Sequence, residues 1–348
     1  MINGDLWSYL AQTDKPIVMY GMGNGADKIL SVLEGYNVKV ADFFASDGFV
    51  RGHSFHGKRV LSFSEIKEKY DSFIILLSFG SSLPEVLKVI YDMSEQYEMY
   101  APDVPVAGKQ LFTYDFYLNN YEKIKSAEKL LADEKSVSIY NDVIAYKLSG
   151  RIDYLRSSFV SPDDVFKNIL DPASYRTYVD LGAYNGDTVR QLLSYGATPE
   201  KIVAFEPDRK NFKKLALYAE GMDGLELYNA AAWSANGSVC FSNEGNRNSG
   251  VSASGTPTEC LCLDSIESAR LADYIKYDVE GSELEALKGS ADIIKNRAPD
   301  LLVSLYHRSE DVFSLVEFVK SLNPQYKLYI RRFEYVPAWD LCLIATVK

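Results

Sequence analysis

The sequence predicts an α/β protein with two parallel sheets of unequal size, separated by a helical connector. Short apolar segments alternate with helical patterns through residues 1–105 and again through residues 166–348, and this alternation is typical of parallel sheets. Residues 106–165 instead carry apolar side chains at helical spacing. A length of 348 residues also favours more than one domain. We therefore expect a Rossmann-like domain at 1–105, a connector at 106–165 and a larger α/β domain at 166–348.

Composition narrows the class of protein. The chain has 37 Lys and Arg against 48 Asp and Glu, a net charge of −11, which argues against broad nucleic-acid binding because that requires neutralised phosphates.

The longest apolar run, residues 73–77, is far below the ~20 residues that span a bilayer. Four cysteines are too few for a disulfide framework, and no signal-peptide pattern opens the chain. We expect a cytoplasmic protein; the sequence leaves its oligomeric state open, with a homo-oligomer as one alternative.

In the first unit, we expect strands at residues 16–20, 38–42 and 72–79, with helices at 27–33 and from 84 to about 98. The turn after the first strand fits G-x-G-x-x-G/A with Gly21, Gly23 and, in the third place, Ala26; it also contains Gly25, and Asp42 follows at the distance of a ribose-binding acid. One interpretation is a nucleotide or nucleotide-sugar pocket. The alternative is a turn that only packs a helix on a strand, because the unit has about half the length of a dinucleotide domain.

The connector contains closely spaced aromatic residues at 112–121, followed by helical patterns at 123–131 and 137–148 and a stop at Gly150. We expect it to pack on the second unit through these aromatic side chains.

The second unit should form a seven-stranded sheet. Its strands are predicted at residues 177–181, 201–205, 225–229, 274–279, 301–306, 327–333 and 341–347. The last two are joined by a short loop, so they should form a hairpin that adds one antiparallel strand. Ligands bind such sheets outside the carboxyl ends of the strands, where the strand order reverses. The segment 243–258, rich in Gly, Ser and Asn, is interpreted as a mobile loop over this site.

The segment 178–188 is the most informative part of the chain. It is a strand that ends in Asp180, followed by a turn with Gly182 and Gly186 and by a residue run that can start a helix. The next strand ends in Glu206. An acid about 20 residues after a glycine turn is placed to bind the two hydroxyls of a ribose. The pair predicts a nucleoside-binding site.

Further ionisable residues follow the later strands. Asp278 and Glu280 are expected to share one face of a strand and to point at the ligand. Ser282 and Glu285 have capping-box spacing. His307 ends the fifth strand and is the candidate general base, with Glu280 in reserve. The spacing supports no metal site.

The segments VDLGAYNGDT, VAFEPD, LCLDSI and IKYDVEGSELEALKGS together resemble the FkbM family of S-adenosylmethionine-dependent methyltransferases, over residues 175–307. The resemblance implies a class I methyltransferase fold and O-methylation, often of sugars. It implies that residues 180–188 surround the methionine part of the cofactor and that Asp208 and residues 230–232 lie towards the adenine. The resemblance and the strand-end and glycine-turn patterns together predict the residues that bind the cofactor: Asp180, Gly182, Ala183, Tyr184, Gly186, Asp187, Thr188, Glu206, Pro207, Asp208, Ala231 and Asp278.

We therefore expect an O-methyltransferase that acts on a hydroxyl of a sugar, a glycan or a similar small molecule. Two alternatives stay open. A nucleotide-dependent oxidoreductase would use the glycine turn at residues 21–26. A non-catalytic protein would bind S-adenosylmethionine or a nucleotide-sugar without turnover.

Overall fold

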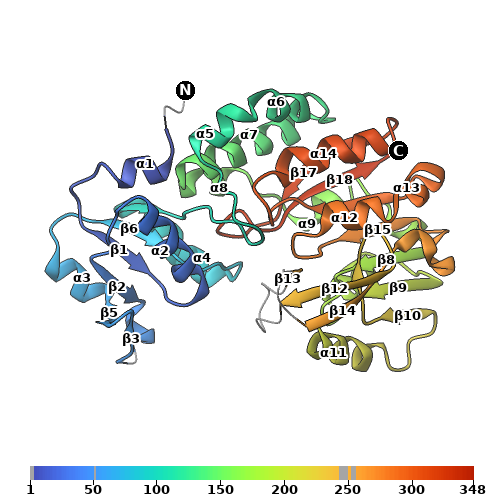
Figure 1. Cartoon of the computed structure of the whole chain (residues 1–348), viewed down its shortest axis with the longest axis horizontal. Helices are drawn as coiled ribbons and strands as arrows, with labels where there is room; N and C mark the ends of the chain where they lie inside the picture. Colours follow the sequence, from blue (N-terminus) through green and yellow to red (C-terminus); the bar gives the residue numbers. More distant parts are fainter. Residues whose placement is uncertain (1–3, 51, 243–249, 252–255) are drawn as a thin grey trace.

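The computed structural model describes residues 4–50, 52–242, 250–251 and 256–348. The molecule is elongated, with a five-stranded sheet at one end and a seven-stranded sheet at the other, and helices α5 to α8 lie between them along one side (Figure 1). The mixed α/β class and the two sheets agree with the sequence prediction. The domain boundaries at residues 105 and 165 stay predictions.

The first sheet has the order β5-β2-β1-β6-β7, and all its strand pairs are parallel. Its strands are β1 (Ile17–Tyr20), β2 (Asp42–Ala45), β5 (Leu61–Ser62), β6 (Ile74–Leu77) and β7 (Glu98–Tyr100). The predicted strand at 38–42 is wrong in position: Asp42 begins β2 instead of ending it, and pairs in register with Val18 of β1. The more apolar run Phe43-Phe44 forms the buried strand.

Four helices accompany this sheet: α1 (Leu6–Leu10), α2 (Asn24–Gly35), α3 (Phe63–Lys69) and α4 (Pro84–Gln96). A small hairpin is formed by β3 (Ser54–Phe55) and β4 (Lys58–Arg59). Ser62 and Glu65 form a reciprocal capping box at the start of α3, which satisfies backbone donors that a helix leaves unpaired.

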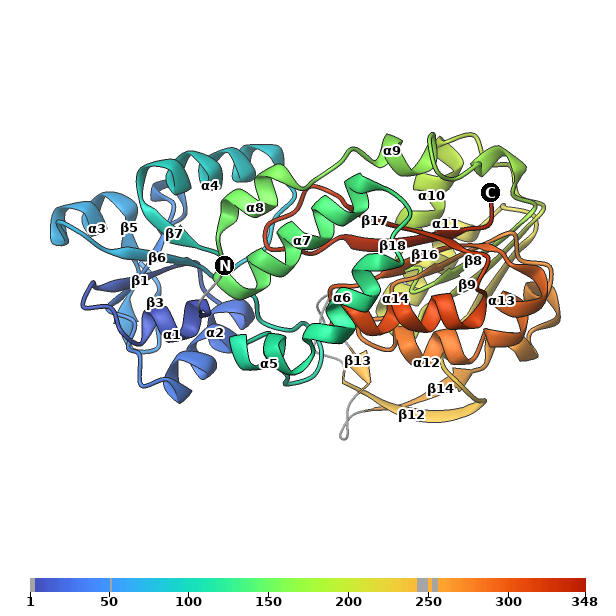
Figure 2. The same cartoon turned by 90° about the horizontal axis from the view of Figure 1, so that it is seen from above.

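The connector consists of α5 (Tyr114–Asn119), α6 (Tyr121–Lys129), α7 (Glu134–Ser149), α8 (Ile152–Ser157) and α9 (Pro162–Phe166). Gly150 ends α7 in the left-handed conformation, as expected. The Phe116 ring lies 6.1 Å from that of Phe313 in the second unit, so the aromatic segment packs between units as predicted. Figure 2 shows α7 in the middle of the molecule, between the two sheets.

The second sheet has the order β10-β9-β8-β15-β16-β18-β17, with β18 antiparallel to both of its neighbours. Its strands are β8 (Thr177–Leu181), β9 (Lys201–Phe205), β10 (Leu225–Tyr228), β15 (Tyr274–Tyr277), β16 (Asp300–Ser304), β17 (Lys327–Arg332) and β18 (Leu341–Thr346). The seven strands and the terminal hairpin confirm the prediction. The order reverses between β8 and β15, which places the expected ligand crevice at their carboxyl ends.

The helices of this unit are α10 (Asp187–Ser194), α11 (Arg209–Ala219), α12 (Glu283–Lys288), α13 (Ala291–Arg297) and α14 (Asp311–Leu322). A further sheet contains β11 (Ala231–Ala232), β12 (Gly237–Ser242), β13 (Gly250–Val251) and β14 (Thr256–Leu261). The sequence did not predict it. Of the predicted loop at 243–258, residues 243–249 and 252–255 lie outside the described residues; the end of the segment is part of β14.

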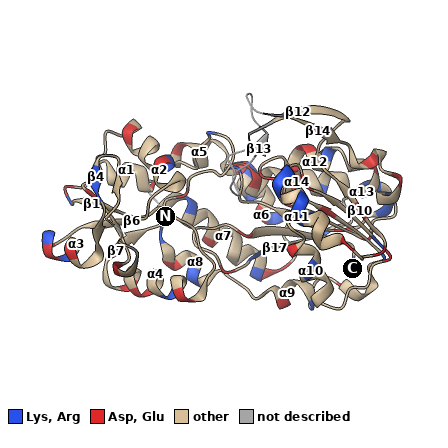
Figure 3. Ribbon diagram, turned by 90° about the horizontal axis from the view of Figure 1, so that it is seen from below, with Lys and Arg blue, Asp and Glu red and all other residues tan. Residues whose placement is uncertain are grey.

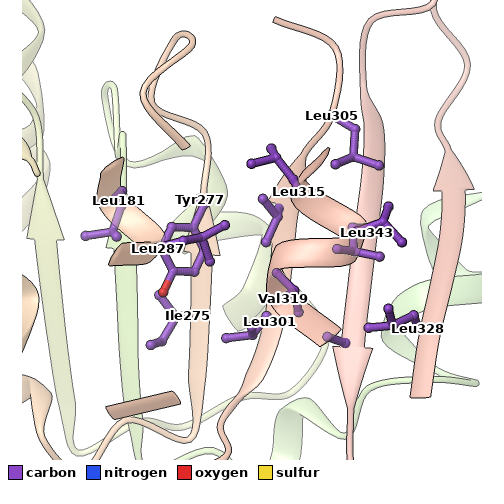
Figure 4. Close-up of a cluster of buried hydrophobic side chains, with 14 of the residues drawn as sticks. Leu181, Ile275, Tyr277, Leu287, Leu301, Leu305, Leu315, Val319, Leu328 and Leu343 are labelled. Carbon is purple, nitrogen blue, oxygen red and sulfur yellow. The ribbon is translucent and has the colours of Figure 1, made fainter. Parts of the chain in front are cut away.

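The core of the second unit is a continuous apolar cluster beside the sheet. Figure 4 shows Leu181, Ile275 and Tyr277 from β8 and β15 close to Leu287 of α12, with Leu301 and Leu343 further along the sheet and Val319 on the helix α14. Each of these side chains is fully buried. This packing fixes the strands whose ends carry the ionisable residues.

The tip of the β17–β18 hairpin belongs to the core of the first unit. Val336 and Ala338 are buried in one cluster with Val18 and Leu77. Backbone hydrogen bonds join Ser81 N to Val336 O (2.9 Å) and Val336 N to Ser81 O (3.1 Å). The two units are therefore held together by the C-terminal hairpin.

Candidate functional site

A cavity of about 280 Å³ opens at the carboxyl ends of β8, β9 and β15, where the strand order reverses. It is lined by residues from both units: Ser82, Gly182, Tyr184, Asp187, Thr188, Phe205, Glu206, Pro207, Asp208, Asn211, Ala230, Ala231, Ala232, Lys276, Asp278, Val279, Glu280, Ser282, Tyr306 and Asp340. Most of the predicted cofactor residues are among them. Asp180, Ala183 and Gly186 do not line the cavity and lie behind it.

The glycine turn is shaped by close backbone contacts. Gly182 has a φ of 86°, and a Cβ added there would lie 1.9 Å from the carbonyl oxygen of Asp278. The amides of Gly182 and Ala183 both donate to Phe205 O (3.0 and 2.9 Å). Tyr184 takes a φ of 47° and lines the cavity. Only glycine fits at 182, because the turn lies against the β15 loop.

Glu206 is held at the end of β9 by two backbone donors. Its Oε2 accepts from Tyr184 N (2.9 Å) and its Oε1 from Asp208 N (2.8 Å). Burial raises the pKa of this carboxyl to about 7, against the opposing effect of these hydrogen bonds. Each carboxylate oxygen can accept a second hydrogen bond. The side chain therefore has capacity to bind a pair of hydroxyls from the cavity.

The far wall of the cavity beyond Glu206 is apolar and small. Ala231 and its neighbours at 230 and 232 are buried beside Phe205. Asp208 caps α11 by accepting from Lys210 N and Asn211 N, both at 2.9 Å.

A buried lysine that the sequence analysis missed lies between two of the predicted acids. Lys276 Nζ is 3.3 Å from Asp180 Oδ1 and 3.8 Å from Asp278 Oδ2, and it donates to Gly182 O at 2.8 Å. Burial lowers its pKa, but the carboxylates outweigh burial and raise it, so the ammonium stays charged. The signal was present: Lys276 is the one charged residue of β15 and pairs in register with Asp180 of β8.

Asp278 and Glu280 both line the cavity. The prediction that they share one face of a strand is wrong. β15 ends at Tyr277, and Glu280 has a φ of 54° in the turn that follows. Asp278 Oδ1 accepts from the hydroxyls of Ser304 and Tyr306, each at 3.0 Å. Burial opposes ionisation of Asp278, but Lys276 and His307 outweigh it and lower its pKa.

His307 is brought to the predicted acids, but it does not line the cavity and is fully buried. Its Nδ1 lies 2.8 Å from Glu283 Oε1, and its Nε2 lies 3.4 Å from Glu280 Oε2. Neither ring nitrogen is aligned for a hydrogen bond with a described residue. The attraction between the ring and these carboxylates is therefore chiefly Coulombic. Burial lowers the pKa of His307, but Glu283 and Glu280 outweigh it and raise the pKa well above 6.5.

The predicted capping box at Ser282 and Glu285 is wrong. Ser282 makes no side-chain cap, and Glu285 instead accepts from Ser234 and pairs with Lys288. Glu283, which the sequence analysis passed over, accepts from Val279 N at 2.9 Å and supports the turn.

The sequence predicted no metal. Asp278, Glu283 and His307 nevertheless place potential ligand atoms within 4.8 Å of one another. When its imidazole is protonated, however, His307 is itself the cation of this cluster, beside the carboxylates of Asp278 and Glu283.

The second predicted site, in the first unit, is not assembled as expected. Gly21, Gly23 and Gly25 follow β1, but Asp42 lies at the opposite end of β2, where it accepts from Lys69 Nζ (2.8 Å) and Tyr70 Oη. A Cβ at Gly21 would lie 2.6 Å from the Phe79 ring, and one at Gly25 would lie 2.2 Å from Ser78 O. These glycines allow close packing on β6, and Asp42 cannot serve the glycine turn.

Positive and negative side chains are interspersed over the helices of both units (Figure 3). In the described ranges, no helix is long and apolar enough to cross a membrane.

Comparison with known proteins gives a match to one family model, within the second unit. Residues 180–335 match the family model of the methyltransferase FkbM domain. A search of the curated proteins found no significant sequence match.

Among solved structures, Methyltransferase FkbM from Methylobacillus flagellatus KT is similar over 98% of this chain and 90% of its own, with a TM-score of 0.72 and 20% identity. This shows a common fold across both units. An rRNA methylase from Streptococcus thermophilus (14% identity, 53% of this chain and 92% of that chain) has a TM-score of 0.34. Aeropyrum pernix fibrillarin with natively bound S-adenosyl-L-methionine (13%, 52% and 71%) has a TM-score of 0.33. The last two are too distant to support an argument.

Proposed function

We propose that this chain, which carries an FkbM methyltransferase domain at residues 180–335, is an S-adenosylmethionine-dependent O-methyltransferase that acts on a hydroxyl of a sugar, a glycan or a similar molecule. The observation that carries the proposal is Glu206, buried at the end of β9 with acceptor capacity directed at the cavity. A charge-assisted hydrogen bond from a ribose hydroxyl would contribute roughly 1.5–3 kcal/mol.

The donors and acceptors of the cavity fit S-adenosylmethionine along its length. Glu206 would accept from the ribose hydroxyls, and the small residues at 230–232 would leave space for the adenine. The Lys276 ammonium lies in the same cavity and would attract the carboxylate of the methionine part. The bound cofactor would supply a methyl group already activated on a sulfonium.

The protein then has to align an acceptor hydroxyl and remove its proton. Glu280 supports the role of base better than His307 does. Its carboxylate lines the cavity, and burial raises its pKa above 4.5, which strengthens it as a proton acceptor near neutrality. A Glu280 oxygen would take the proton of the acceptor hydroxyl. His307, protonated behind the cavity, would hold Glu280 and Asp278 in place.

The test uses purified protein, S-adenosylmethionine and hydroxylated acceptors such as methyl glycosides. We expect saturable cofactor binding by calorimetry and acceptor-dependent formation of S-adenosylhomocysteine. Absence of binding would refute the proposal. Binding without product for every acceptor would favour the non-catalytic alternative.

The oxidoreductase alternative required Asp42 beside the glycine turn of the first unit, and the position of Asp42 at the other end of β2 removes that support. A fluorescence titration with NADH should show no saturable binding.

A further inference from the structure

The cavity described above extends beyond the residues assigned to the cofactor. Four lining residues come from other parts of the chain: Ser82 from the β6–α4 loop, Glu280, Tyr306 after β16, and Asp340 from the hairpin. Ser82 is the one lining residue that the first unit supplies among the described residues. The first unit therefore forms part of the wall of the methyltransferase cavity.

The Ser82 loop is fixed against the hairpin by a close fit. A Cβ at Gly80 would lie 2.7 Å from atoms of both the Trp339 and the Tyr335 rings. Next to it, Ser81 pairs with Val336 through two backbone hydrogen bonds. These contacts are made by the two residues that precede Ser82, so they fix the part of the loop that leads into it.

Backbone strain is concentrated around the same cavity. Six non-glycine residues have positive φ in the described part of the chain, and three of them line it: Tyr184 at 47°, Glu280 at 54° and Asp340 at 60°. Such conformations are unfavourable for non-glycine residues and gather at ligand-binding positions. Asp340 has this signature although it lies in a hairpin remote in sequence from the cofactor residues.

The charge of the lining restricts the ligand. Apart from Lys276 and the residues assigned to the cofactor, the charged lining residues are Glu280 and Asp340, and both are acidic. Lys276, the one basic lining residue among those described, lies beside Asp180 and Asp278 at the cofactor end. Phosphate and carboxylate groups of an acceptor would be repelled by Glu280 and Asp340, whereas hydroxyls and ammonium groups donate hydrogen bonds to carboxylates.

We propose that Ser82 and Asp340, from the two units, form a subsite for the acceptor, and that this subsite accepts an uncharged or amino-bearing polyhydroxylated molecule and rejects an anionic one. The inference rests on the proposed function, because it assumes that the other end of the cavity holds the cofactor. It assigns the first unit a role in acceptor selection, in place of the nucleotide site predicted from its glycines.

The test measures sugar binding to protein saturated with S-adenosylhomocysteine, by saturation-transfer NMR. The probes are methyl hexosides, 2-amino-hexosides and hexose 6-phosphates. We expect the first two classes to bind and the phosphates to give no signal. Ser82→Trp should reduce binding at least fivefold because the indole fills the subsite. Asp340→Asn, which tolerates the left-handed conformation, should remove any preference for the amino sugars.

Val89→Trp is the matched control, since Val89 is exposed on α4 and does not line the cavity. Binding of S-adenosylhomocysteine is measured first by calorimetry, and its absence would refute the proposed function itself. If that product binds, three results would overturn the subsite alone: no neutral or amino sugar binds, Ser82→Trp behaves like Val89→Trp, or the phosphates bind as well as the neutral sugars.

Discussion

The Oε1 atom of Glu283 lies 2.8 Å from Nδ1 of His307, and neither side chain has more than 1% of its surface exposed. A carboxylate this close to a buried imidazole stabilises the protonated ring. His307 is thus a fixed cation beneath the cavity, and two acids that face the cavity lie on the other side of its ring.

His307→Ala should destabilise the fold by about 3–5 kcal/mol, because it removes one partner from a buried ion cluster. The pKa of His307 is raised in the folded state, so its stabilising contribution is complete below pH 6.5 and is lost as pH rises through the higher folded pKa. Urea unfolding at a series of pH values would measure both effects. The control is His53→Ala, since His53 is exposed. Equal stability of the two variants would contradict the assignment.

Glu280→Gln should lower turnover by roughly 10²–10⁴-fold, the range for loss of a general base, while the dissociation constant for S-adenosylmethionine stays within about twofold. The amide keeps the shape of the side chain but cannot take a proton. Glu285→Gln serves as a control, because Glu285 does not line the cavity. Full activity of Glu280→Gln would exclude Glu280 as the base.

Glu206→Ala should weaken binding of S-adenosylmethionine at least about tenfold, since ~1.4 kcal/mol corresponds to a factor of ten. The pKa of Glu206 is about 7, and the ionised carboxylate is the better acceptor. Affinity should therefore rise as pH increases through 7, with release of a proton on binding. Calorimetry at pH 6, 7 and 8 would detect this. Glu206→Gln should bind S-adenosylmethionine weakly, and its affinity should not rise with pH through the titration of residue 206. If the affinity of the wild-type protein is the same at all three pH values, the ribose contact is contradicted.

Chelation should leave methyl transfer unchanged. Asp278, Glu283 and His307 lie close enough to hold a metal, but a protonated imidazole cannot ligate a metal ion, and its charge offsets one of the two carboxylates. We expect equal initial rates before and after dialysis against EDTA. A loss of activity that Mg²⁺ or Mn²⁺ restores would show that the cluster is a metal site.

Much of the second unit could be predicted from local sequence. The glycine turn at 182 and the acid at 206 are set by short-range geometry, because each strand ends where its apolar run ends. The same reasoning failed at Asp42, where the acid precedes the apolar residues of β2 instead of following them. Strand position there is decided by packing on β1, which local spacing does not encode.

The rest of the site depends on contacts between distant segments. Ser82 and Asp340 are 258 positions apart in a chain of 348 residues, and no local pattern predicts that both line one cavity. His307 was placed correctly after the fifth strand, but its burial and its ion pair with Glu283 of α12 come from packing between separate segments. The sequence cannot distinguish a histidine that acts as a general base from one that is a buried cation, because the difference depends on solvent access and on charged neighbours in the fold.

The hairpin tip has a consequence for any attempt to produce the catalytic half by itself. Val336 and Ala338 are interior residues only while the first unit surrounds them. A fragment that starts after the connector would expose these apolar side chains at the end of two long strands, and we expect it to aggregate during expression.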